Sequence, residues 1–216
     1  MNLDAARAQM ISQQLRTWEV SDQRVLDVMA DLPRELFVPE PLKSLAYADI
    51  SIPLGDGHQM LQPKVQARIL QAVAPMPTDS VLEIGTGCGY LTACLARLAG
   101  SVLSLDIDAE CTRQAAARLA QSGDDNVQLE TADAMSAEFE RSFDVIVIGG
   151  SLPVYDHRFE KMLSPGGRLF VVVGAGPARE ARLVTRGSGE GCAREVLFET
   201  DIAPLQNAPQ PDAFVF

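Results

Sequence analysis

A regular alternation of short apolar runs with helix-like segments, between residues 80 and 173, constrains the fold more than any other feature. The runs are apolar throughout, as is typical of strands that are buried on both faces. Strands that alternate with helices pair in parallel, and helices then cover the sheet. The sequence therefore predicts a doubly wound α/β domain. Its strands in this stretch are expected at Ser80–Ile84, Ser101–Asp106, Asn126–Glu130, Phe143–Ile148 and Arg168–Val173.

Helices are predicted between these strands and ahead of them. Gly89–Ala99 has a helical pattern, and Asp108–Gln121 begins with an aspartate that is placed to cap its first turn. Residues 63–75 are predicted to form a further helix, because proline is accepted in a first turn and cannot continue a helix. Near the C-terminus, the runs Ala181–Thr185 and Glu195–Glu199 predict a β-hairpin.

The residues before Pro63 have a different pattern. Apolar residues at helical spacing within 11–18 and 25–32 predict two short helices, and the prolines that follow predict an irregular loop. We therefore expect residues 1–62 to form an N-terminal helical cover and loop. Residues 63–216 are expected to form the α/β core, with both parts in one compact domain.

Composition excludes several classes of function. The chain has 216 residues and a net charge of −11, which argues against binding to nucleic acid, since phosphates attract a basic face. No apolar run approaches the roughly 18 residues of a membrane span, and the first 15 residues lack the apolar centre of a signal peptide. The four cysteines include no Cys-x-x-Cys pair and there are only two histidines, so no metal site is expected. Reduced thiols in a cytoplasmic protein are the expectation.

The sharpest motif is Glu83–Gly89, which reads E-I-G-T-G-C-G and joins a predicted strand to a predicted helix. Glycines at this point let the backbone turn tightly and approach a ligand closely. The spacing G-x-G-x-G differs from the dinucleotide fingerprint G-x-G-x-x-G, and the loop lacks the lysine of a phosphate-binding loop. The acidic residue ahead of the glycines suits a ligand with a cationic or amine-bearing part.

Carboxylates follow two further strands. Asp106 ends the strand after the glycine loop, where a carboxylate accepts hydrogen bonds from both hydroxyls of a ribose. Asp133 follows the third strand, within reach of an adenine amine. In an open α/β sheet these strand ends line one crevice. Together the three features resemble the S-adenosylmethionine site of the seven-stranded methyltransferases, whose fold is a mostly parallel, Rossmann-like sheet. That resemblance implies a cofactor site of Glu83, Gly85, Thr86, Gly87, Gly89, Asp106, Ile107, Asp133, Ala134 and Gly149.

Further segments resemble the protein-L-isoaspartate O-methyltransferase family, and the likeness covers most of the chain. The segments are Gln9–Ile11, Val20–Pro39, His58–Pro63, Val81–Tyr90, Gly149–Pro153, Leu163–Leu169 and Ala203–Leu205. The resemblance implies that S-adenosylmethionine is the methyl donor and S-adenosylhomocysteine the product. It also implies that the acceptor is a carboxylate of damaged aspartyl residues in peptides or proteins, and that His58–Pro63 is the substrate loop.

The substrate loop departs from the family pattern. Leu61 stands where the family has its active-site serine, and Gln59 stands where it has a threonine. Ala134 and Gln206 replace a glycine and a threonine of later motifs. Because Leu61 cannot donate a hydrogen bond, Gln59, Gln62 and Lys64 are the candidates to orient the acceptor. The alternative for Lys64 is a solvated helix face, and for His58 a hydrogen bond to the loop backbone.

Three other functions remain open at this point. A methyltransferase of the same fold could act on a small molecule, with Leu61 as an apolar wall of its pocket. A protein could also bind the cofactor without catalysis, or bind a different nucleotide. The sequence does not indicate an oligomeric state. The tail Phe214–Phe216 is expected to fray or to pack simply.

Overall fold

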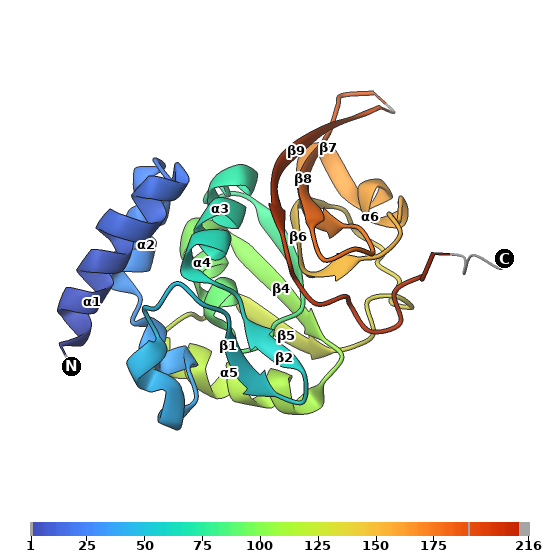
Figure 1. The fold of residues 1–216 in the computed structure, drawn as a ribbon. Coiled ribbons are helices and arrows are strands. Elements are labelled where there is room, and N and C mark those ends of the chain that lie inside the picture. The colour runs from blue at the N-terminus through green and yellow to red at the C-terminus, as the bar shows by residue number, and fades with distance from the viewer. Residues whose placement is uncertain (1, 190, 212–216) are drawn as a thin grey trace, which may run out of the picture.

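The computed structural model describes residues 2–189 and 191–211, and its centre is a seven-stranded sheet (Figure 1). The strand order is β5-β4-β3-β6-β7-β8-β9, with parallel pairing from β5 to β7 and antiparallel pairing of β8 and β9. The prediction of a mostly parallel α/β sheet is confirmed. The strands are β3 (Ser80–Ile84), β4 (Ser101–Asp106), β5 (Val127–Thr131), β6 (Phe143–Leu152), β7 (Leu163–Val173), β8 (Arg179–Arg186) and β9 (Cys192–Thr200).

Both faces of the sheet are buried, which explains why its strands are apolar without alternation. Val81, Val145 and Val147 belong to one core cluster, and their neighbours Leu82 and Ile146 belong to a second cluster on the opposite face. The first face is covered by three helices. They are α3 (Pro63–Val73), α4 (Tyr90–Leu98) and α5 (Ala109–Ser122). Asp108 caps α5 as predicted, because its carboxylate accepts from the Glu110 N–H.

The second face has a lighter cover than the doubly wound prediction implies. Its only named helix among the described residues is the short α6 (Arg158–Lys161), which the sequence analysis did not predict. Phe159 of α6, Ala134 and Ala208 complete this core with irregular chain between them. β6 continues past its predicted end at Ile148, and β7 begins before its predicted start at Arg168. The pairing of the two strands shifts register between Val147 and Ser151, where Gly149 and Gly150 lie.

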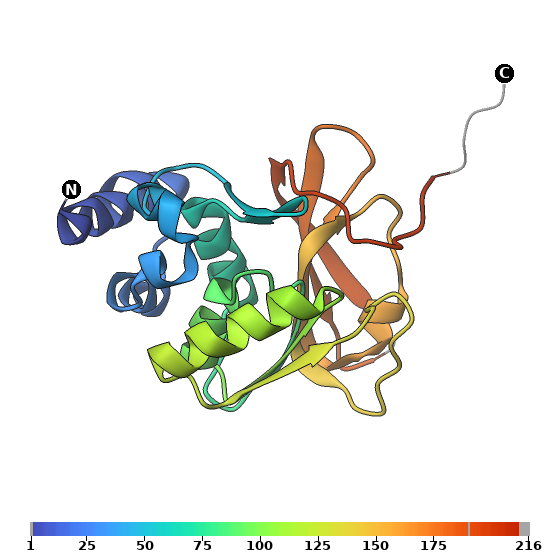
Figure 2. The ribbon, with the colours of Figure 1, turned by 90° about the horizontal axis from the view of Figure 1, so that it is seen from below.

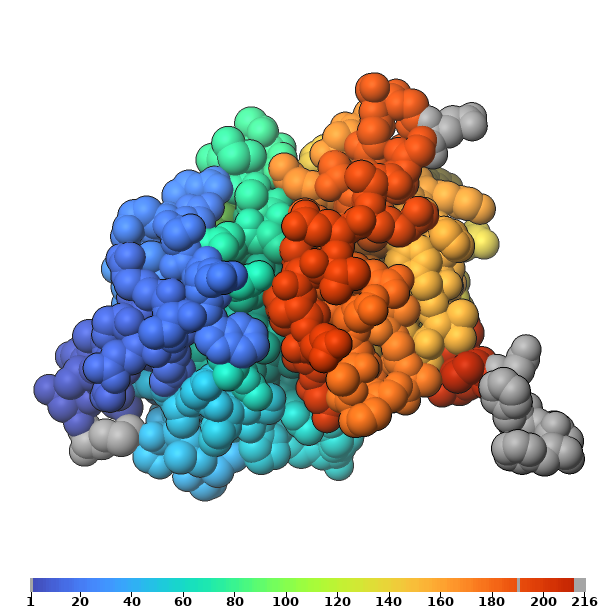
Figure 3. Space-filling model, turned by 45° about the horizontal axis from the view of Figure 1, so that its top comes forward, coloured from blue at the N-terminus to red at the C-terminus, as the bar shows by residue number. Residues whose placement is uncertain are grey.

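The N-terminal segment forms helices, as expected, and packs outside α3 and α4 (Figures 1 and 2). The first helix, α1 (Leu3–Gln9), continues as a π-helical turn and a short 3₁₀ turn to Trp18, and α2 (Gln23–Asp31) follows. The buried apolar residues of this N-terminal segment belong to the same core cluster as one face of the sheet. In Figure 3 the blue N-terminal segment faces the red C-terminal hairpin, and Trp18 meets Phe198 at a ring distance of 6.0 Å. The division at residue 62 stays a prediction.

The expected irregular loop before Pro63 is in fact partly ordered. It contains 3₁₀ turns at Arg34–Phe37 and Glu40–Leu45, and then a two-stranded hairpin of β1 (Ile52–Gly55) and β2 (His58–Met60). The turn between these strands has three successive residues with positive φ, Gly55–Gly57. Asp56 and Gly57 form a favoured hairpin pair, a signal that the expectation of an irregular loop did not use.

Three expectations remain, on membrane spans, on the C-terminal tail and on the cysteines. No helix of the described residues is long and apolar enough to cross a membrane. The tail Phe214–Phe216 lies outside the described residues. All four cysteines are free thiols, and Cys88 and Cys94 are buried among core residues.

Candidate active site

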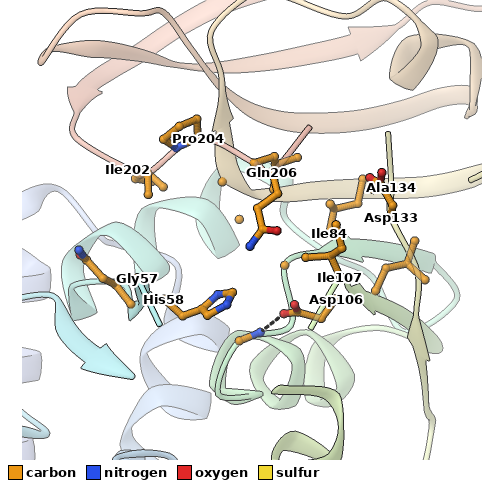
Figure 4. A pocket seen from close by; sticks show the side chains of 18 of the residues that line it. Gly57, His58, Ile84, Asp106, Ile107, Asp133, Ala134, Ile202, Pro204 and Gln206 are labelled. Carbon is orange, nitrogen blue, oxygen red and sulfur yellow. Dashed lines mark hydrogen bonds between the residues drawn. The ribbon is translucent and has the colours of Figure 1, made fainter. Parts of the chain in front are cut away.

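A crevice of about 330 Å³ opens at the carboxyl ends of β3, β4, β5 and β6 (Figure 4). The sheet supplies one wall and two loops supply the other. We call the first the cofactor wall. It consists of Ile84, Gly85, Gly87, Leu105, Asp106, Ile107, Ala132, Asp133, Ala134, Met135, Gly149 and Gly150. We call the second the acceptor wall. It consists of Asp56–Gln59, Leu61 and Asp201–Gln206.

The glycine loop after β3 takes its shape from backbone conformations that favour glycine. Gly85, Gly87 and Gly89 have φ values of 95°, 52° and 87°. The Gly85 and Thr86 N–H groups both donate to the Leu105 carbonyl, at 2.8 and 3.2 Å, which ties the loop to β4. A Cβ on Gly85 would lie 3.8 Å from the Gly149 Cα. The floor of the crevice between β3 and β6 is therefore free of side chains.

Asp106 is held rigidly beside this loop. One carboxylate oxygen accepts from the Gly87 N–H at 2.8 Å and the other from the Asp108 N–H at 3.0 Å. Its exposure is only 5%, yet the residue lines the crevice. Asp133 is held in the same way, by the Met135 N–H at 2.8 Å and the Asn207 side-chain amide at 2.9 Å. Each oxygen keeps a second lone pair for a ligand.

Glu83 lies behind the cofactor wall and does not line the crevice. Its side chain is fully buried, and its Oε2 accepts from the hydroxyls of Thr92 at 2.5 Å and Ser104 at 2.7 Å. Its Oε1 has no partner. Burial, with a smaller contribution from the charge of Asp106, raises the pKa of Glu83 to about 7.

Three of the predicted cofactor residues thus support the site from behind. Besides Glu83, they are Thr86 and Gly89. The Thr86 hydroxyl bonds the Ser104 hydroxyl at 2.6 Å, and a Cβ on Gly89 would lie 3.1 Å from the Ala115 Cβ of α5. The other seven predicted cofactor residues line the crevice. The two groups look alike in sequence, because a glycine loop does not show which of its residues face the ligand.

The acceptor wall is anchored at both ends by groups that sequence reasoning missed. Ser151 pairs with the chain at Ala203 and Leu205 through its backbone, and its hydroxyl donates to the Ile202 carbonyl at 2.8 Å. Gly150 allows this approach, since a Cβ there would lie 2.6 Å from the Leu205 side chain.

The hairpin side of this wall is held by a buried arginine. Arg34 donates to the Leu61 carbonyl at 2.6 Å and to the Ala46 carbonyl at 2.8 Å, and it stacks over the Tyr90 ring at 4.7 Å. It also donates to Gln66. Burial lowers the pKa of Arg34. A buried residue of this kind has no local sequence signal, because its partners come from three separate segments.

The structure separates the candidates for orienting an acceptor. Gln59 and Leu61 line the crevice, but Gln62 does not. Lys64 is also excluded from the crevice lining. Its ammonium donates to Asp49 at 2.7 Å and stacks over Trp18, so the expectation of a solvated residue is wrong too.

Two further polar side chains reach the crevice. Gln206 points into it in Figure 4. His58 lines it as well and places its Nε2 3.4 Å from an oxygen of Asp108, so its partner is a side chain and not the loop backbone.

Known proteins resemble this chain over nearly its whole length. The profile of the protein-L-isoaspartate(D-aspartate) O-methyltransferase (PCMT) family matches residues 5–207. A protein-L-isoaspartate O-methyltransferase of Koribacter versatilis is 36% identical over 200 residues, which are 92% of this chain and 90% of the relative. One of Roseiflexus castenholzii is 36% identical over 187 residues, which are 86% and 85% of the two chains.

Solved structures show the same fold. The crystal structure of a putative protein-L-isoaspartate O-methyltransferase from Plasmodium falciparum was determined in complex with S-adenosyl-L-homocysteine. It matches with a TM-score of 0.80, over 95% of this chain and 99% of that chain. The sequence identity is 17%, so this likeness concerns the fold alone.

Proposed function

Because this chain belongs to the protein-L-isoaspartate(D-aspartate) O-methyltransferase family, we propose that it methylates the free carboxylate of isoaspartyl residues in damaged proteins. It is an S-adenosylmethionine-dependent enzyme, and S-adenosylhomocysteine is its product. The observation that carries the proposal is the pairing of a rigid cofactor wall with an acceptor wall across one crevice. The family match disfavours a small-molecule acceptor, a non-catalytic role and a different nucleotide.

The cofactor wall fits the parts of S-adenosylmethionine one by one. Asp106 can accept from the ribose hydroxyls, since each of its oxygens has only one backbone donor. Asp133 can accept from the adenine amine, and Ile107 and Ala134 supply apolar surface beside it. The glycine floor at Gly85 leaves room for the remaining part of the cofactor.

The chemistry asks little of the acceptor wall. The bound cofactor supplies a methyl group on a sulfonium, which the acceptor oxygen attacks in line. A carboxylic acid with a pKa of about 4 is ionised at neutral pH, so no general base is needed. The protein has to hold the carboxylate in line and keep water away, and orientation of this kind contributes roughly 7–11 kcal/mol in well-aligned systems.

Gln59 and Gln206 take the place of the family hydroxyl in this proposal. Both line the crevice, and each has an amide N–H₂ that can donate to a carboxylate. Leu61, Ile202 and Pro204 lie on the same wall and exclude water from the acceptor. Gln62 has no role in this arrangement.

We further propose that the enzyme works in the cytoplasm on proteins as acceptors. The four cysteines support a reducing compartment, because all are free thiols and two are buried in the core.

The test uses methyl-labelled S-adenosylmethionine and two peptides that differ only in having an aspartyl or an isoaspartyl linkage. We expect base-labile label in the isoaspartyl peptide alone. Binding of S-adenosylhomocysteine, measured in parallel by calorimetry, serves as the control for a folded site. Binding without transfer to either peptide would contradict the proposed acceptor while leaving the cofactor assignment intact.

A further inference from the structure

A second cluster of reactive side chains lies at the seam between the β1–β2 hairpin and α5. It consists of His58 on the hairpin, Asp108 at the start of α5 and Cys111 in its first turn. One nitrogen, oxygen or sulfur atom from each residue lies within 4.8 Å of the other two. The His58 Nε2 is 3.4 Å from Asp108 Oδ2, and the Cys111 Sγ is 3.8 Å from the same oxygen.

Two of these separations, 3.4 and 3.8 Å, are close to those between neighbouring ligands of a tetrahedral metal ion. Zinc bonds are roughly 2.0–2.2 Å long to nitrogen or oxygen and about 2.3 Å to sulfur. Tetrahedral angles then place neighbouring ligand atoms roughly 3.3–3.7 Å apart. To share one ion, the three side chains have to rotate closer together, because their ligand atoms are spread over up to 4.8 Å.

The local structure leaves one oxygen of Asp108 available to bind an ion. Asp108 caps α5 with Oδ1, which accepts from the Glu110 N–H at 2.8 Å, so Oδ2 is left for the cluster. Asp108 and Cys111 are three residues apart and share one face of the helix. The side chains of His58 and Asp108 are 22% and 30% exposed, so an ion has access and water can complete its coordination.

The charges around the cluster also favour a cation. The Asp106 carboxylate is close to the cluster, because it accepts a hydrogen bond from the Asp108 N–H at 3.0 Å. Within the described ranges, no lysine or arginine forms a salt bridge with Asp106 or Asp108. The only cation-forming partner of Asp108 there is His58. A thiolate ligand selects zinc-class transition metals over magnesium and calcium, which prefer all-oxygen sites.

We propose that His58, Asp108 and Cys111 form a site for a zinc-class divalent metal ion, which clips the hairpin to α5. The ion would be held by one nitrogen, one oxygen and one sulfur, with the thiol proton released on binding. Because His58 also lines the crevice, the clip fixes part of the acceptor wall. Sequence spacing does not reveal such a site, since the hairpin and α5 are separate in the chain.

The direct test is metal binding by the full-length protein after treatment with a chelator. We expect one Zn²⁺ per chain by calorimetry, and one Co²⁺ with the near-ultraviolet absorption of a thiolate-to-cobalt bond. Cys111→Ser should weaken Zn²⁺ binding at least tenfold and abolish that absorption. Asp108→Asn should also weaken binding while keeping the helix cap, because asparagine caps as well as aspartate. Cys192→Ser, on β9 away from the cluster, should change neither.

A second measurement tests the clip itself. Hydrogen exchange should slow in the amides of residues 52–60 when Zn²⁺ is added, and His58→Gln should abolish that protection. Absence of binding, or binding that Cys111→Ser leaves unchanged, overturns the site. Binding without protection of the hairpin overturns the role of His58 as a ligand. Neither measurement involves methyl transfer, so their outcome is independent of the proposed function.

Discussion

The two walls of the crevice are built in different ways. The cofactor wall stands on the ends of buried parallel strands, and its carboxylates and glycines are fixed by backbone hydrogen bonds, as at Asp106 and Gly85. The acceptor wall consists of a short hairpin and the chain from Asp201 to Gln206. Its contacts with the sheet include those of Ser151 with Ile202 and of Arg179 with Asp201. Loops can change side chains without disturbing a core.

The difference between the walls follows the likeness to the family. The glycine motif and Asp106 keep the pattern that the sequence shares with isoaspartyl methyltransferases. The departures, Leu61, Gln59 and Gln206, all lie on the acceptor wall, with Ala134 as the exception. In the proposed assignment, the binding of the methyl donor is built into the sheet, whereas the orientation of the acceptor is left to the loops.

The largest expected effect concerns the buried carboxyl behind the cofactor wall. Since the folded-state pKa of Glu83 is about 7 and its unfolded value is 4.5, the folded protein binds the extra proton between these values. The free energy of unfolding therefore falls as pH rises from 4.5 to 7, by about 3 kcal/mol from this group. Glu83→Gln keeps an acceptor for Thr92 and Ser104 and removes the titration.

Urea unfolding at a series of pH values measures this effect. Relative to wild type, Glu83→Gln should gain stability as pH rises through that window, by about 3 kcal/mol in all. Glu195→Gln on β9, which removes an exposed carboxyl outside the buried cluster, is the matched control. Parallel pH profiles for Glu83→Gln and wild type would show that the buried carboxyl behind the cofactor wall does not have a raised pKa.

An effect of comparable free energy, here a gain in kcat, is expected from Leu61→Ser on the acceptor wall. A well-placed donor in a catalytic site is worth roughly 10²–10³ in rate, so kcat on an isoaspartyl peptide should rise by about 100-fold. Leu61→Ala removes the same apolar bulk without adding a hydroxyl and serves as the control. If the serine and alanine variants have equal kcat, a missing hydroxyl is not what distinguishes this wall from the family pattern.

A somewhat smaller loss is expected on the cofactor wall from Asp106→Ala. Hydrogen bonds to a charged group are worth about 1.5–3 kcal/mol, so the Kd for S-adenosylhomocysteine should rise at least tenfold. Asp106→Asn separates charge from shape, because it can still accept from the Gly87 N–H, and should lose less. Calorimetry measures both values of Kd. An unchanged Kd for Asp106→Ala would show that Asp106 does not bind the ribose.

The contrast between the walls also explains what the sequence could predict. β3 and β4 have the predicted bounds, since a strand buried on both faces has an unmistakable apolar run. Asp106 and Asp133 were predictable because strand ends meet at one edge of the sheet. Features made by contacts between distant segments were not. Arg34 reaches Leu61 across 27 positions, and Ser151 reaches Ile202 across 51.

The same reasoning accounts for the places where the structure differs from the expectation. Gln62 is next to Leu61 in sequence and Gln59 is two positions before it, but the chain turns from β2 into α3 between them, and only Gln59 lines the crevice. The β1–β2 hairpin was missed because its strands are too short for an alternating pattern to be visible. Lys64 was mistaken for a solvated residue because its partners, Asp49 and Trp18, come from earlier segments.

The smallest effects are expected for the glutamines, and they test the acceptor wall residue by residue. Gln59→Ala and Gln206→Ala each remove one neutral donor, which is worth about 1 kcal/mol, so kcat/KM on an isoaspartyl peptide should fall about fivefold in each. Gln62 directly follows Leu61 but lies outside the crevice lining, so Gln62→Ala should change kcat/KM less than twofold. The Kd for S-adenosylhomocysteine should stay constant in all three, since none touches the cofactor wall. A larger loss in Gln62→Ala than in the other two would show that the turn into α3, and not the crevice face of the hairpin, positions the acceptor.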